Sequence, residues 1–118
     1  MKYMIMMFGC TSEALAERPA EWIAGMQDLL MGLDAELRES GEWVAGDALA
    51  DPSQASTVVF RNGAPAVTDG PFPEIKESLA GYWIVEASHE RAVEITSRVV
   101  AYTGFPMEVR QLMDQTQP

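Results

Sequence analysis

The segment from Met4 to Phe8 constrains the fold most, because every residue in it is apolar. In an extended strand, successive side chains point to opposite faces. One face therefore carries Tyr3, Ile5 and Met7, and the other carries Met4, Met6 and Phe8. Both faces of this strand therefore need apolar cover. Gly81–Glu86 predicts a second strand of the same kind, with large apolar side chains on each face.

Residues Pro19 to Ser40 predict the first long helix. Apolar side chains recur at helical spacing along it, at Trp22, Met26, Leu29, Leu30, Leu33 and Leu37. Pro19 suits the first turn, and Gly41 suits the position after the last turn. Gly25 and Gly32 lie beside the apolar stripe, and we expect another element to approach closely at both.

The remaining elements follow from turn and cap residues. They are a strand over Trp43–Leu49, a loop over Asp51–Gln54, a hairpin over Thr57–Thr68 that turns at Asn62-Gly63, a helical turn over Glu74–Leu79, a helix capped by Ser88 that runs to about Tyr102, and a strand over Met107–Leu112.

This order predicts an α+β fold of the ferredoxin-like β-α-β-β-α-β type, with a β-hairpin insertion between its halves. We expect a single domain over residues 1–118, in which two helices cover one face of an antiparallel sheet. Since both faces of the central strands are apolar, the second face needs a partner. A second copy of the chain supplies the same surface, so the pattern predicts a homodimer.

Charge and cysteine content exclude several classes of protein. Eighteen acidic residues against eight basic ones give a net charge of −10, which opposes direct binding to nucleic acid and to anionic membranes. The single cysteine, Cys10, allows no intramolecular disulfide, and no Cys/His set indicates a metal. No phosphate-binding or dinucleotide-binding motif indicates a cofactor. The apolar N-terminus is too short for a signal peptide or a membrane span, so we expect a cytoplasmic protein.

One motif points to a family. Thr68–Glu77 has the sequence TDGPFPEIKE and is followed by Gly81-Tyr82-Trp83, and the chain also carries Gly46–Leu49 and the closing segment Glu108–Leu112. These residues resemble the signature of the DGPF proteins, a bacterial branch of the YCII-related family. The resemblance implies a ferredoxin-like domain of the dimeric α+β-barrel superfamily and an association with a sigma factor. It implies no settled reaction.

The resemblance also implies a site that this chain lacks. Related YCII-type proteins are thought to use a histidine on the first helix together with an aspartate as an acid–base pair. Because the first helix, Pro19–Ser40, contains no histidine, that pair cannot be carried over to this sequence.

The segment Asp69-Gly70-Pro71-Phe72 has two interpretations. As a structural turn, Asp69 accepts backbone N–H bonds, Gly70 relieves the restriction before proline, and Phe72 packs as an apolar plug. As part of a ligand cleft, it contributes to a binding set made of Asp69, Phe72, Lys76, Glu77, Tyr82 and Trp83. Asp69 and Lys76 could then hold a substrate or act as an acid–base pair, whereas Lys76 and Glu77 could equally form an exposed salt bridge.

Two further residues deserve a chemical interpretation. His89, the sole histidine, is the second catalytic candidate as a general base, although an ordinary residue at the start of a helix is the favoured interpretation. Cys10 follows the first strand and is expected to be a buried small hydrophobe rather than a reactive thiol.

Two functions remain open on this sequence. The first is a dimeric module that binds a small ligand or a protein, associated with sigma-factor-linked regulation of transcription. The alternative is a small enzyme with a cleft, which performs acid–base chemistry on a small organic substrate with Asp69, Lys76, Glu77 or His89.

Overall fold

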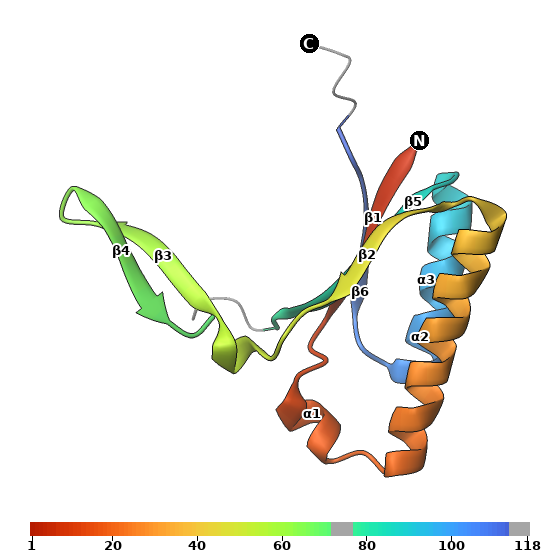
Figure 1. Cartoon of the computed structure of the whole chain (residues 1–118), viewed down its shortest axis with the longest axis horizontal. Helices are drawn as coiled ribbons and strands as arrows, with labels where there is room; N and C mark the ends of the chain where they lie inside the picture. The colour runs from red at the N-terminus through yellow and green to blue at the C-terminus, as the bar shows by residue number, and fades with distance from the viewer. Residues whose placement is uncertain (72–76, 114–118) are drawn as a thin grey trace.

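The computed structural model describes residues 1–71 and 77–113, and its elements form an α+β fold (Figure 1). In chain order they are β1 (Lys2–Phe8), α1 (Ser12–Ala16), α2 (Ala20–Ser40), β2 (Trp43–Ala48), the 3₁₀ turn η1 (Pro52–Gln54), β3 (Ser56–Arg61), β4 (Ala64–Asp69), β5 (Leu79–Glu86), α3 (His89–Thr103) and β6 (Met107–Gln111).

The main sheet has four strands in the order β2-β5-β1-β6, and each neighbouring pair is antiparallel. This is the strand order of the ferredoxin-like fold, in which the two apolar strands of the sequence, β1 and β5, occupy the centre. The long helices α2 and α3 both lie on one side of the sheet (Figure 1). The predicted fold class is therefore confirmed.

The core lies between these helices and one face of the sheet. Its side chains come from β1, β5, α2 and α3, namely Tyr3, Ile5, Met7, Trp83, Val85, Leu33, Leu37, Ala92, Ile95 and Val99. The alternation expected along β1 is confirmed, because Tyr3, Ile5 and Met7 are buried whereas Met4 and Met6 on the other face are only partly buried. That other face of the sheet carries no helix, and we call it the open face.

The helix ends form as local sequence predicts. Ser88 caps α3 by accepting the backbone N–H of Arg91, and Gly41 follows α2 with φ of 82°, where a residue with a Cβ is disfavoured. Gly25 lies directly against the Tyr102 hydroxyl, so the close approach expected there is confirmed. The same expectation for Gly32 is wrong, because nothing lies within 4 Å of the position its Cβ would take.

Two local predictions need correction. The short helix α1 was not expected, and it forms because the Thr11 side chain accepts the N–H of Ala14. Leu79 begins β5 instead of ending a helical turn, since β5 pairs with β1 as far as Phe8. The rest of that expected turn, Glu74–Lys76, lies outside the described residues.

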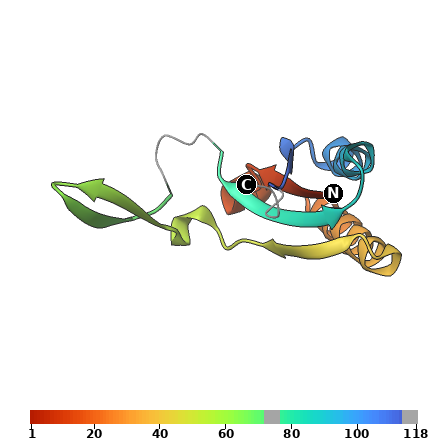
Figure 2. The ribbon, with the colours of Figure 1, turned by 90° about the horizontal axis from the view of Figure 1, so that it is seen from above.

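The hairpin of β3 and β4 forms a separate two-stranded sheet. Asn62 and Gly63 turn it with φ of 50° and 80°, as the sequence predicts. The hairpin projects from the body on the side of the sheet away from the helices (Figure 1), and from above it extends well beyond the main sheet (Figure 2).

None of the helices within residues 1–71 and 77–113 is both long and apolar enough to cross a membrane.

Candidate functional site

A cavity of about 480 Å³ lies between α2 and the sheet corner formed by β2 and β5. Its walls are mainly apolar, and the polar side chains that α2 adds to them are Gln27 and Asp34. The apolar lining residues come from distant parts of the chain and include Ile5, Met7, Leu15, Met26, Leu30, Met31, Ala48, Leu49, Ala80, Trp83 and Met107. Such a volume and lining are typical of small-molecule sites.

The cavity exists because three positions at this corner of the sheet, Gly46, Ala48 and Gly81, carry little or no side chain. Pairing places Gly46 opposite Trp83 and Ala48 opposite Gly81, so these small residues share the face of the sheet that α2 covers. At Gly46 an added Cβ would lie 2.5 Å from Cδ1 of Trp83 and 3.0 Å from the Tyr82 carbonyl oxygen. Glycine at this position therefore allows the Trp83 indole to lie over β2 and form part of the cavity wall.

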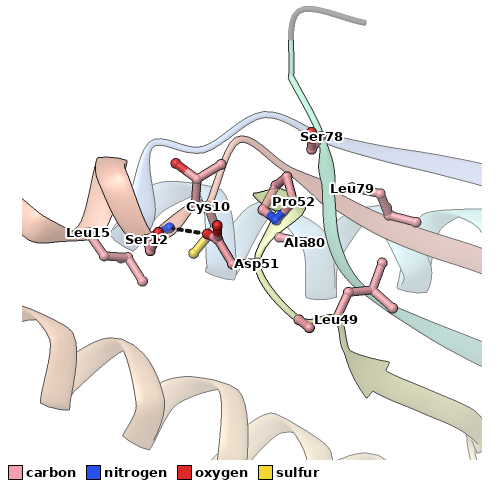
Figure 3. A pocket seen from close by; sticks show the side chains of 11 residues that line it. Cys10, Ser12, Leu15, Leu49, Asp51, Pro52, Ser78, Leu79 and Ala80 are labelled. Carbon is pink, nitrogen blue, oxygen red and sulfur yellow. Dashed lines mark hydrogen bonds between the residues drawn. The ribbon is translucent and has the colours of Figure 1, made fainter. Parts of the chain in front are cut away.

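A smaller cavity of about 220 Å³ adjoins the first and shares Cys10, Leu15, Leu49 and Ala80 with it. At its edge the Asp51 carboxylate accepts the backbone N–H of Ser12 at 2.9 Å, as Figure 3 shows. The same carboxylate accepts the Ser53 hydroxyl at 2.7 Å and the Ser53 N–H at 3.2 Å. The Ser53 hydroxyl and then the Ser12 N–H hold the pKa of Asp51 well below its usual range. Asp51 thus fixes η1 to the start of α1.

Cys10 lines both cavities and is only partly buried. It packs against the hydrophobic core but is less buried than the sequence predicts. Burial raises the pKa of its thiol, so the protonated and weakly nucleophilic form dominates near neutral pH.

Asp69, the predicted centre of the site, is an exposed residue at the end of β4. Its carboxylate makes no hydrogen bond to any other residue within 1–71 and 77–113. The chain turns after it at Gly70, which has φ of 90° and whose N–H donates to the Ala55 carbonyl at 2.7 Å. The proposed plug Phe72 and the proposed partner Lys76 lie outside the described residues.

The other predicted ligand residues lie in different environments. The Glu77 carboxyl group lies against Gly9, with its carbon 3.4 Å from the position a Cβ would take there. Tyr82 and Trp83 both belong to the cavity lining, but as neighbours on β5 they point to opposite faces of the sheet. Only the Trp83 side chain lies on the buried face that the cavity borders.

His89, the second catalytic candidate, lies at the opposite end of the sheet. It is the exposed first residue of α3, and its ring lies against Tyr3 with 5.6 Å between ring centroids. Tyr3 pairs with Val85, whereas the cavity lies near the other end of β1, where Met7 pairs with Gly81. The structure therefore brings His89 neither to the cavity nor to Asp69.

The profile of the YCII-related domain matches residues 1–114. The chain belongs to the YCII-related family. A curated protein named xylulose kinase, from Lactococcus lactis subsp. lactis strain IL1403, is 24% identical over 102 residues. That alignment covers 86% of this chain but only 20% of the kinase, so this YCII-related chain spans about a fifth of the length of the curated relative it matches.

Sequence reasoning missed most of both cavities in this YCII-related protein, including Gln27 and Asp34 of the larger one and Asp51 of the smaller one. One signal was available, because Gly46 and Gly81 both interrupt strands, and glycine within a strand marks close approach of another group. Within residues 1–71 and 77–113, no three His, Cys, Asp or Glu side chains come together in an arrangement that could hold a metal ion.

Proposed function

We propose that this YCII-related protein binds a small, mainly apolar organic molecule in the larger cavity. The observation that carries the proposal is a volume of about 480 Å³ above the side-chain-poor corner of Gly46, Ala48 and Gly81. Ligand sites usually have about 300–1,000 Å³, apolar walls and a few polar groups. This cavity has all three properties.

The polar groups restrict the ligand's chemistry. Asp34 already accepts the indole N–H of Trp43 at 3.1 Å and the Nε–H of Arg38 at 2.8 Å, which fixes its carboxylate at the cavity wall. A carboxylate has about four acceptor positions, so Asp34 retains capacity for a donor on the ligand. The net charge of −10 repels anions. A neutral or cationic molecule with an apolar body and one hydrogen-bond donor fits best.

A cavity-filling variant tests the proposal with the neutral fluorescent probe N-phenyl-1-naphthylamine. Ala48→Leu adds side-chain volume on the face that borders the cavity, so we expect it to weaken probe binding by at least about tenfold. Ala24→Leu makes the same change at an exposed position of α2, outside the cavity lining, and should bind the probe as the wild type does. Equal affinity in the two variants would remove the cavity as the binding site.

An acid–base enzyme is the weaker alternative. Cys10, the thiol in the cavity, has a raised pKa, and His89 lies at the other end of the sheet. The cavity residues thus supply surfaces and hydrogen bonds rather than an activated nucleophile.

A homodimer through the open face forms a second part of the proposal. The partly buried Met4, Met6, Tyr82 and Ile84 lie on this face without helical cover. We expect Met6→Glu to make the protein monomeric in sedimentation equilibrium, because it would place a charge at the centre of the interface. A wild type that is already monomeric at high concentration would refute the dimer.

Association with a sigma factor is a third, separate proposal, and it depends on the DGPF resemblance alone. Co-purification with a sigma factor of the same organism tests it. Failure of the two purified proteins to form a complex at micromolar concentration would remove it.

A further inference from the structure

The β3–β4 hairpin is an element that the chain alone does not support. It forms its own two-stranded sheet, and the Cα radius of gyration is 16.4 Å, against about 13 Å for a compact chain of this length. A two-stranded hairpin in water is marginally stable at best. The hairpin therefore needs a surface from outside its own chain.

The hairpin has one exposed apolar face that could meet such a surface. Val58 pairs with Val67, and Phe60 pairs with Pro65, so these four side chains share a face. Val58, Phe60 and Val67 are 63%, 75% and 69% exposed. Monomeric proteins seldom leave several large apolar side chains together in water.

The distribution of charge favours a second copy of the chain as the partner. The hairpin residues 56–69 contain one Arg and one Asp, Arg61 and Asp69, and are therefore neutral in a chain with net charge −10. Two copies repel one another through most of their surface but not through this segment. A strongly acidic partner or a nucleic acid would gain nothing from a neutral apolar face.

The position of the hairpin supports the same partner. The hairpin and the helices lie on opposite sides of the main sheet, so the hairpin stands on the side of the open face (Figure 1). A copy placed on the open face would lie beside the hairpin. Two-fold symmetry would then place the hairpin of each copy against the other copy. One association would then cover both unpartnered apolar surfaces.

We propose that the β3–β4 hairpin is a dimerisation arm, whose Val58/Phe60/Val67 face packs on a second copy of this chain seated on the open face. The inference rests on the homodimer part of the proposed function and adds a second interface to it. It is independent of ligand binding in the cavity.

Hydrogen exchange at two protein concentrations tests the arm directly. Above the dimer dissociation constant, we expect the β3 and β4 amides to be protected. Below it, they should exchange nearly as fast as in an unfolded chain, whereas the β1 and β5 amides stay protected at both concentrations. Equal protection of the hairpin at both concentrations would overturn the proposal, and so would a wild-type dimer whose hairpin amides remain unprotected.

Matched double variants test which surface is used. Val58→Thr with Val67→Thr keeps β-branched side chains in the hairpin but makes its exposed face polar. We expect this variant to raise the dimer dissociation constant by at least about tenfold in sedimentation equilibrium. Val93→Thr with Val100→Thr makes the same changes at exposed positions of α3 and should leave the constant unchanged.

The outcomes separate the proposals. If Met6→Glu disrupts the dimer and the hairpin variant does not, the arm is refuted while the open-face dimer stands. If the wild type is monomeric but still binds N-phenyl-1-naphthylamine, both dimer interfaces are refuted while the cavity stands. If the hairpin variant becomes monomeric and keeps its probe affinity, the arm is supported as an element separate from the ligand site.

Discussion

The substitution Gly46→Ala tests whether this corner of the sheet is built around Trp83. A Cβ at position 46 would lie 2.5 Å from Cδ1 of Trp83, and carbon atoms pack best at about 3.5–4.0 Å, so the indole would have to move by about 1 Å. The Tyr82 carbonyl oxygen, 3.0 Å from the same point, belongs to the paired backbone and cannot yield as easily. Overpacking of this kind costs about 1–3 kcal/mol, and the loss of a glycine from the unfolded chain returns about 0.4–1 kcal/mol.

Gly32→Ala is the matched control, because nothing lies within 4 Å of its Cβ position and it sits within α2. Alanine there should stabilise the protein by up to about 1 kcal/mol. We therefore expect the two variants to differ by about 2 kcal/mol in free energy of unfolding by urea denaturation. A Gly46→Ala variant within about 0.5 kcal/mol of Gly32→Ala would refute the steric role of Gly46.

Two further predictions concern charged groups. Arg91 donates two hydrogen bonds to Glu42 and one each to Glu36 and Glu94, with its side chain only 26% exposed. Arg91→Ala should therefore lower the free energy of unfolding by about 1–2 kcal/mol. Arg98→Ala loses one exposed ion pair with Glu36 and should lower it by less than about 1 kcal/mol. Equal losses in the two variants would contradict the larger role of Arg91. Asp51→Asn should lower the urea midpoint at neutral pH. Because the folded-state pKa of Asp51 is depressed, its contribution to stability is complete above the unfolded pKa of about 3.9 and fades as pH falls below that value. The difference in urea midpoint between Asp51→Asn and the wild type should therefore narrow at about pH 3. A difference that widens there would refute the stabilising role of the Asp51 carboxylate.

The regular elements were predictable because their signals are local. The apolar run Met4–Phe8 predicts a strand, and Asn62-Gly63 predicts a tight turn, without knowledge of any distant residue. Gly32 shows the limit of such signals. A glycine in a helix permits a close neighbour but does not bring one, and only at Gly25 does Tyr102 take the space.

The cavity could not be predicted in the same way, because it consists of side-chain volume that is missing where five separate segments of the chain meet. Gly46 and Gly81 are more than thirty residues apart, and only the antiparallel pairing of β2 with β5 places them at one corner. The motif Asp69-Gly70-Pro71-Phe72 attracted the functional interpretation because it resembles the family signature, yet Asp69 lies at the base of the projecting hairpin. Asp69 thus lies where the chain enters and leaves the hairpin. The sequence signal was therefore informative about where the chain turns, whereas the cavity depends on which small residues the pairing of β2 with β5 brings opposite α2.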